Sequence, residues 1–368
     1  MRLVLACLLL LGCGTPLPPR FVAEQSAAER AYGQGEYRTA AARWHAAAEA
    51  APSAREREEA IYRQAASLER AGDRSAAESI YANLERGSGE RAERAAFARA
   101  ESVIARGELS GGYASLRQAL IRFPGSGLAR HALRRFLEHA RETRGAEAER
   151  TEIERLLSEL RGSELEENLT FTRAQWLESA GQLQAACTAY LEQAARFPYP
   201  KGAFWDDALL AAARLEEGLG RPRAAVVHLE RLLRERETAR MSGSYERTSY
   251  AQARFRIAEI YRDALQDPKR ARLEFRRVWA DHPTSRLGDD ALFEEALLAL
   301  RSQDRTGACD AAKLLVEREA SSRFSVCAHA LCPKLSSTAG VCRPYLEARI
   351  DTATQPASGN DDHSSSSR

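Results

Sequence analysis

One short phrase recurs along the chain at intervals close to 37 residues. It begins with glycine at positions 35, 72, 107, 145, 181 and 220, so that successive glycines are 37, 35, 38, 36 and 39 residues apart. In most copies alanine follows five residues later, and an aromatic or large apolar residue follows nine residues later. Further copies begin at Gln266 and near Asp304. A repeat of this length is typical of a chain that stacks one small structural unit many times.

Proline marks the end of the phrase. It stands seventeen residues after the first position in four copies, at Pro52, Pro124, Pro198 and Pro283. Glycine can adopt the positive φ that ends a first helix, small alanine allows a second helix to approach closely, and proline stops that second helix. No long stretch alternates with the period of a strand. The sequence therefore predicts an all-α solenoid of about eight helical hairpins.

This set of features resembles tetratricopeptide-repeat proteins, whose units are about 34 residues long. The resemblance extends from about residue 21 to 324. Within it, the runs RFPGSGLARHAL (122–133) and DHPTSRLGDDALFEEA (281–296) are similar to a Pro-x-Ser pattern of BamD-like and CpoB-like periplasmic lipoproteins and coordinators. The resemblance implies a superhelix whose first helices line a groove for protein partners.

The family's groove positions can be carried over to this chain. They give Tyr62, Ala66 and Glu69 in the second unit, Phe97, Glu101 and Ile104 in the third, and Phe171, Gln175, Leu210 and Arg214 in the fifth and sixth. The set lacks the Lys and Asn pattern that clamps a terminal carboxylate, so we expect an extended or helical segment with apolar anchors to bind. The alternative is that the two phenylalanines pack between units.

The N-terminus has the layout of an export signal. A positive start precedes an apolar run at residues 3–11, which is far shorter than the ~20 residues that cross a bilayer. Gly12 directly before Cys13 resembles the bacterial lipobox, whose cysteine is acylated and becomes the first residue of the mature chain. The alternative is an ordinary signal peptide that is cut near Pro16.

These features predict a signal peptide at residues 1–12, a lipid (palmitate) on Cys13 and a Pro-rich tether at residues 13–20. Gly14 follows the cysteine where an inner-membrane retention signal would have Asp. We therefore expect a protein that is lipid-anchored in the bacterial outer membrane and faces the periplasm.

Four cysteines cluster near the C-terminus, at positions 309, 327, 332 and 342. An even, local set in an exported chain favours disulfides. The spacing slightly favours Cys309–Cys327 with Cys332–Cys342. Free thiols are one alternative, and a metal site is another, because Cys327, His329 and Cys332 could supply ligands. Cys187 stands alone inside a repeat, where we expect a buried, small apolar residue.

The remaining boundaries follow from composition. We expect repeat arrays at 21–234 and 250–324, separated by a polar loop or bend at 235–249, which is otherwise a harmless surface insertion. A Cys-rich helical cap is expected at 325–350, and a disordered polar tail at 351–368.

Charge and motifs argue against several functions. The 54 basic and 52 acidic residues give a net charge of +2, which offers nucleic acid no basic excess. Phosphate-binding loops, HExxH and Gly-x-Ser-x-Gly are lacking, so we expect no cofactor, no metal, no small-molecule substrate and no enzyme activity. The leading hypothesis is a scaffold in envelope assembly, for outer-membrane proteins, secretins or pili, or wall-linked complexes. The alternative is an adaptor or regulator of a cell-wall enzyme.

Overall fold

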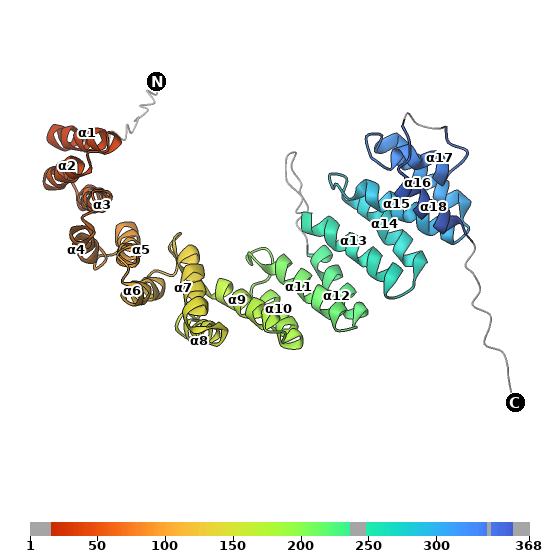
Figure 1. Ribbon diagram of the computed structural model, residues 1–368, viewed down its shortest axis with the longest axis horizontal. Coiled ribbons are helices and arrows are strands. Elements are labelled where there is room, and N and C mark those ends of the chain that lie inside the picture. Colours follow the sequence, from red (N-terminus) through yellow and green to blue (C-terminus); the bar gives the residue numbers. More distant parts are fainter. Residues whose placement is uncertain (1–15, 236–247, 337–339, 356–368) are drawn as a thin grey trace, which may run out of the picture. The chain divides into compact units, whose positions relative to one another are not determined.

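The computed structural model of this chain describes residues 16–235, 248–336 and 340–355. In these three ranges the regular structure is entirely helical, with no strand, and helices α1 to α16 pair into eight hairpins (Figure 1). The predicted all-α solenoid of about eight hairpins is confirmed.

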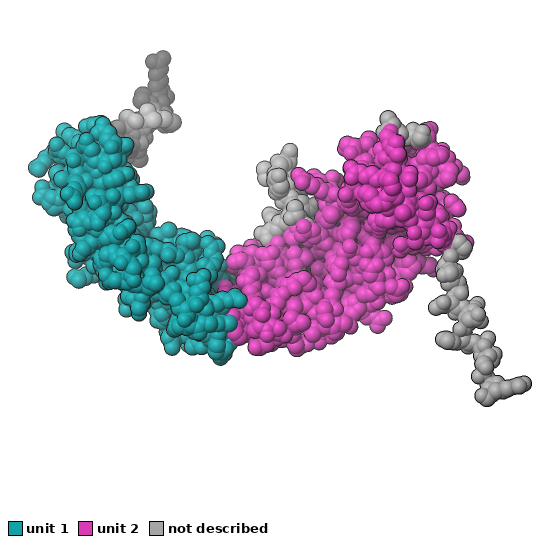
Figure 2. Space-filling view, viewed as in Figure 1, with its two compact units in different colours: residues 1–169 teal, residues 170–368 magenta. Residues whose placement is uncertain are grey.

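The chain forms two compact units, residues 1–169 and 170–368 (Figure 2). The boundary lies inside helix α9 (Glu166–Ser179) and not at the polar loop that the sequence suggested for 235–249. Most of that loop, residues 236–247, is outside the described residues.

The first unit holds four hairpins. Their helices are α1 (Pro19–Gly33), α2 (Tyr37–Ala50), α3 (Ala54–Arg70), α4 (Arg74–Leu84), α5 (Glu90–Ala105), α6 (Leu109–Arg122), α7 (Ala129–Arg144) and α8 (Ala146–Glu159). The second unit continues from α9 with α10 (Leu183–Arg196), α11 (Trp205–Gly218), α12 (Pro222–Arg234), α13 (Thr248–Asp263), α14 (Pro268–Asp281), α15 (Gly288–Arg301) and α16 (Arg305–Arg318).

Every hairpin turns on a residue with positive φ at the first position of the phrase. Glycine occupies this position in six hairpins, and Gln266 (φ 51°) and Gln303 (φ 57°) occupy it in the last two. A Cβ built on Gly35 or Gly181 meets no atom within 4 Å. Glycine is therefore used here for its backbone conformation and not for lack of space.

The alanine five residues after the turn is the point of closest helix approach. It is fully buried in six hairpins, at Ala40, Ala77, Ala186, Ala225, Ala271 and Ala308. The third hairpin has Gly112 instead, and a Cβ there would lie 2.9 Å from the backbone nitrogen of Ile104. Helices α5 and α6 therefore pack more closely than any side chain at this position would allow.

The last hairpin is closed by a cap. It consists of the 3-10 turn η1 (Ser325–Cys327) and the helices α17 (Ala328–Leu331) and α18 (Pro344–Thr354). Leu346, Ile350 and Ala353 of α18 are buried in the same core cluster as α15 and α16. In a stacked array the final hairpin would otherwise leave its apolar face in water.

The predicted tail therefore begins too early. Residues 351–354 belong to α18, because Ala353 continues the apolar face that Leu346 and Ile350 begin. The predicted tether likewise ends too late, since α1 begins at Pro19, where proline fits the first helical turn. Residues 356–368 lie outside the described part.

Two disulfides hold the cap, Cys309–Cys332 and Cys327–Cys342. The pairing that we favoured from spacing is wrong. The reason is that the segment from Ser325 to Leu331 is a 3-10 turn followed by one helical turn, and Cys332 then takes an extended conformation. Because the chain changes direction here, Cys332 lies beside Cys309 of α16. Cys327 lies beside Cys342, in the segment before α18.

The proposed metal ligands are used otherwise. Both cysteines of the suggested site are in disulfides, and Nδ1 of His329 lies 2.8 Å from the carbonyl oxygen of Leu335. In the described ranges no group of three or more His, Cys, Asp or Glu side chains is placed to hold a metal. Cys187 is buried, as predicted, and is not in a disulfide.

Cys13 and the whole predicted signal peptide lie outside the described residues. Among the helices that are described, none has the length and apolar content needed to cross a membrane.

Candidate protein-binding cleft

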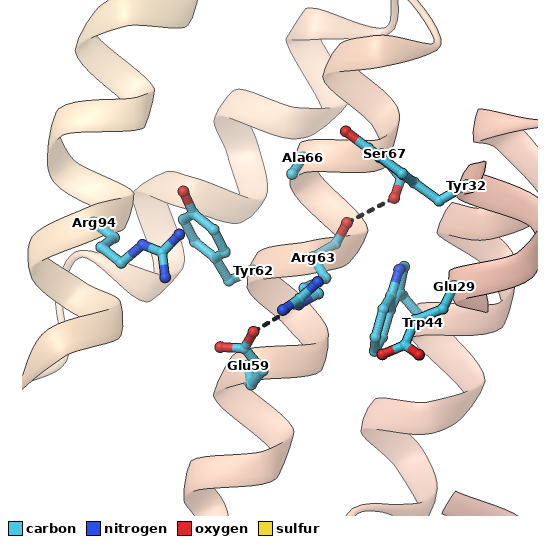
Figure 3. Close-up of a pocket in the computed structure, with 9 residues that line it drawn as sticks. All are labelled: Glu29, Tyr32, Trp44, Glu59, Tyr62, Arg63, Ala66, Ser67 and Arg94. Atoms are coloured by element: carbon cyan, nitrogen blue, oxygen red, sulfur yellow. Dashed lines mark hydrogen bonds and ion pairs between the residues drawn. The ribbon is translucent and has the colours of Figure 1, made fainter. Parts of the chain in front are cut away.

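A hollow of about 360 Å³ lies between the first helices of the first unit (Figure 3). Helix α3 contributes most of its wall, and α1, α2 and α5 complete it. The lining residues are Glu29, Tyr32, Trp44, Glu59, Tyr62, Arg63, Ala66, Ser67 and Arg94. Aromatic rings and arginines therefore meet at one place, on helices that are adjacent in the stack.

The two guanidinium groups are held against rings. The Cζ atom of Arg63 is 5.4 Å from the centroid of the Trp44 ring, and that of Arg94 is 4.7 Å from the Tyr62 ring. Nε of Arg63 also donates a hydrogen bond of 2.6 Å to Glu59. Cation–π contacts of this kind keep the arginines along the wall of the hollow.

A second hollow of about 380 Å³ adjoins the first and shares Trp44 and Glu59 with it. Leu17, just before α1, lines this second hollow together with Phe21 and Gln25 of α1. The first hollow has Glu29 and Tyr32 from the end of α1. We call the two hollows together the α1–α3 cleft, because they follow α1 from one end to the other.

Of the groove residues that the sequence predicts in the first unit, some line the cleft and others pack between helices or form ion pairs. Tyr62 and Ala66 line the α1–α3 cleft. Phe97 is only 3% exposed, so the alternative of a packing role holds for it. Glu101 forms an ion pair with Arg135 of α7. Ile104 lies against Gly112 of α6.

Glu69 lies beside the cleft on α3. Tyr81 of α4 donates a hydrogen bond of 3.5 Å to its Oε2 atom. Burial raises the pKa of Glu69 above its ordinary value, and nearby Arg74 partly offsets this shift. This carboxylate therefore braces α3 against α4 rather than facing the cleft.

In the second unit, Leu210 and Arg214 line another hollow, of about 440 Å³, together with Arg256 of α13. Phe171 is stacked on Phe204 with ring centroids 4.6 Å apart, so it too packs between helices. Gln175 is exposed on α9. The ten predicted groove residues thus divide between the two units, and only four of them, Tyr62, Ala66, Leu210 and Arg214, line hollows.

Ion pairs tie the first helices of the second unit to one another. Arg214 of α11 pairs with Glu178 of α9 at 2.6 Å, and Arg256 of α13 pairs with Glu217 of α11 at 2.6 Å. Glu294 of α15 then binds Arg262 of α13 at 2.8 Å and Arg349 of α18 at 2.6 Å. Helix α18 therefore takes the place of a further first helix.

The contrast between the units decides which hollow is the better binding site. In the second unit, Arg214 and Arg256 are already paired with glutamates of neighbouring first helices. The α1–α3 cleft instead presents Tyr32, Tyr62 and Ala66 at the corresponding places. These three side chains carry no charge, so a partner can bury them while the Glu59–Arg63 ion pair of the same cleft stays intact.

Among the cleft residues that the sequence analysis missed, the three on α1 that are named below could have been found from their spacing. Tyr62, Ala66 and Glu69 stand ten, six and three residues before their turn glycine, Gly72. The same offsets from Gly35 give Gln25, Glu29 and Tyr32, and all three line the cleft. Applying the groove positions to the first unit would have found them.

Residues 252–285 match the family model of the tetratricopeptide repeat. This stretch corresponds to the hairpin of α13 and α14, and the other seven hairpins repeat its turn conformation. The fold is an α-solenoid of the tetratricopeptide-repeat type. Such arrays interact with other proteins, and no catalytic family is indicated.

Solved tetratricopeptide-repeat structures are similar to this repeat protein at low identity. One is the C-terminal part of a repeat-containing protein from Cytophaga hutchinsonii, at 12% identity over 72% of this chain and 97% of that chain, with a TM-score of 0.43. Another, from Parabacteroides merdae, is 14% identical over 76% of this chain and 99% of that chain, with a TM-score of 0.32. No curated protein matches the sequence.

Proposed function

We propose that this tetratricopeptide-repeat protein is a non-enzymatic scaffold that binds a segment of a partner protein in the α1–α3 cleft. It is anchored by a lipid on Cys13 to the outer membrane, faces the periplasm and serves an envelope-assembly complex. The observation that carries the proposal is the cleft itself. It brings Trp44, Tyr32 and Tyr62 together with Arg63 and Arg94.

Trp, Tyr and Arg are the residue types that contribute most to binding energy in protein interfaces. Tyr32 is 37% exposed, and Tyr62 is half-buried, so both offer ring surface to a partner. The cleft also contains Glu59, which pairs with Arg63 at 2.6 Å. An apolar anchor of the partner would pack on the rings, and polar groups beside it would meet these charges.

The test is recovery of envelope partners after crosslinking in cells. Replacing Tyr32 and Tyr62 together by Ala should lower recovery at least tenfold, because two interface anchors of this kind each contribute more than about 1 kcal/mol. The matched control is Leu273→Ala, which removes an exposed side chain of α14 in the other unit. Equal recovery with wild type, double variant and control would rule out the cleft as the site.

The anchor is tested separately. Cys13→Ala should move the protein from the membrane fraction to the soluble fraction and abolish incorporation of labelled palmitate. The helical circular dichroism signal should remain, because Cys13 precedes the first helix. Labelling that survives this substitution would remove the lipid from the proposal and leave the cleft unaffected.

A further inference from the structure

The α1–α3 cleft begins at the first residues of the folded chain. Leu17, which is 45% exposed, and Phe21 line its second hollow. Leu17 follows Cys13 by only four residues in the sequence. The position of the cleft is therefore tied closely to the position of the proposed lipid, and the inference below rests on that part of the proposed function.

The length of the extended chain limits the distance between Cys13 and Leu17. Four residues extend at most about 14 Å when fully stretched. Helix α1 has 15 residues, which rise about 22 Å from one end to the other. With Cys13 acylated, Leu17 at the edge of the second hollow lies within about 14 Å of the lipid-bearing residue, and the first hollow lies at the far end of α1.

We propose that the natural occupant of the cleft is an amphipathic juxtamembrane segment of an integral membrane protein. Such a segment leaves the bilayer at the level where the cleft begins. Because both proteins are held at one membrane surface, a partner of this kind gains effective concentration from the anchor that a freely diffusing partner does not gain.

The chemistry of the second hollow fits this occupant. Its apolar part is chiefly Leu17, which is 45% exposed and lies over the buried residues Phe21, Trp44 and Ala60. An apolar side chain of an amphipathic segment would pack on Leu17. The charged part of the hollow consists of Arg55, Glu56, Glu59 and Arg91, two residues of each sign. Charges of both signs suit a peptide with mixed charges, whereas an anionic lipid surface requires a basic excess.

The test combines site-specific photocrosslinking with a change of tether length. A photoreactive phenylalanine analogue replaces Gln25 in the cleft, or Leu128 as an exposed control position in the same unit. Each is placed in the full chain and in a variant with a 30-residue Gly/Ser segment inserted between Thr15 and Pro16. A matched variant carries the same segment after Pro356.

The inference predicts adducts from Gln25, and not from Leu128, that map within about 15 residues of a partner's membrane-spanning segment. Lengthening the N-terminal tether should lower their yield by about tenfold, because effective concentration falls with the −3/2 power of linker length or faster. The insertion after Pro356 should leave the yield unchanged.

Other outcomes would overturn it. Adducts with a soluble protein, a yield that does not depend on the tether, or adducts with lipid alone would each exclude a juxtamembrane occupant. In the first two cases the proposed function stands if Tyr32→Ala with Tyr62→Ala still lowers the yield. A complete lack of adducts at Gln25 would count against both proposals.

Discussion

The hydroxyl of Tyr190 donates a hydrogen bond of 3.0 Å to Oε2 of Glu178 across the two helices of one hairpin. Tyr81 and Glu69 form the same pair in another hairpin, at 3.5 Å. In both cases tyrosine stands nine residues after the turn glycine and glutamate three residues before it. Glu178 also forms an ion pair with Arg214 of the next hairpin. The same carboxylate therefore connects the two helices of its own hairpin and joins that hairpin to the next.

Tyr190→Phe should lower the free energy of unfolding by about 1–2 kcal/mol, because a buried hydrogen bond to a charged acceptor is lost while the ring remains. Tyr81→Phe is the matched comparison and should have a smaller effect, since its bond is longer. Chemical denaturation of both variants measures the difference. Equal, negligible effects would show that neither bond stabilises its hairpin.

Gly112→Ala should destabilise the first unit by about 1–3 kcal/mol, because the added methyl group would overlap Ile104 of α5. Gly111→Ala is the matched control on the same helix, and its nearest neighbour would be 3.9 Å away. It should be neutral or stabilising by up to ~1 kcal/mol, because Ala is the better helix former. Thermal unfolding of both variants checks this, and a stable Gly112→Ala protein would contradict the close approach.

Gln303→Gly should stabilise the last hairpin by about 0.5 kcal/mol. The change relieves a left-handed conformation that costs an L-residue about 1–2 kcal/mol, and the greater freedom of glycine in the unfolded chain offsets part of the gain. Gln266→Gly should gain less, because Nε2 of Gln266 donates a hydrogen bond of 2.7 Å to the carbonyl oxygen of Asp263. Denaturant titration ranks the two, and destabilisation at Gln303 would contradict the argument.

Cys187 should be inert to alkylating reagents in the folded protein even at pH 9. Burial, and next its hydrogen bond to Glu216 at 3.2 Å, raise the pKa of its thiol from 9.0 to about 12. At pH 9 the thiolate fraction is then only about one thousandth. Mass spectrometry after iodoacetamide treatment should show modification of Cys187 only when the protein is unfolded, and rapid labelling of Cys187 in the folded protein would contradict this.

The same shift makes stability depend on pH. Because the pKa of Cys187 is higher in the folded chain than in the unfolded chain, the folded chain keeps the proton longer. The contribution of the protonated Cys187 thiol to the free energy of unfolding is complete below about pH 9 and is lost as the pH rises through about 12. Cys187→Ala should therefore show a shallower fall in stability over this window than the wild type.

Replacing Cys327 and Cys342 by Ser should lower stability by about 3 kcal/mol, because the bond closes a loop with a separation of 15 residues. Protease cleavage should then appear first around α18, which depends on this bond and on Arg349–Glu294 for its position. Replacing Cys309 and Cys332 should have a similar or slightly larger effect, since their separation is 23 residues. Peptide mapping without reduction checks the pairing itself, and a Cys309–Cys327 peptide would contradict the structure.

Much of the fold could be read from local spacing. The turn positions, the buried alanines and the helix-ending prolines depend on short-range backbone chemistry, so the phrase alone predicted eight hairpins and their order. The same kind of signal would have found Gln25, Glu29 and Tyr32 in the first unit, where the groove positions follow from the turn at Gly35.

Other properties depend on which helices meet, and spacing does not contain that information. Phe97 and Tyr62 occupy the same offset in adjacent hairpins, yet Phe97 is buried and Tyr62 lines the cleft. The turn that separates Cys327 from Cys332 decided the disulfides, because it changes the direction of the chain within five residues. The sequence by itself determined the repeating unit, since each hairpin is encoded by contacts close in the chain. Only the tertiary structure decided which faces stay open, because burial depends on which neighbouring helices pack against each face.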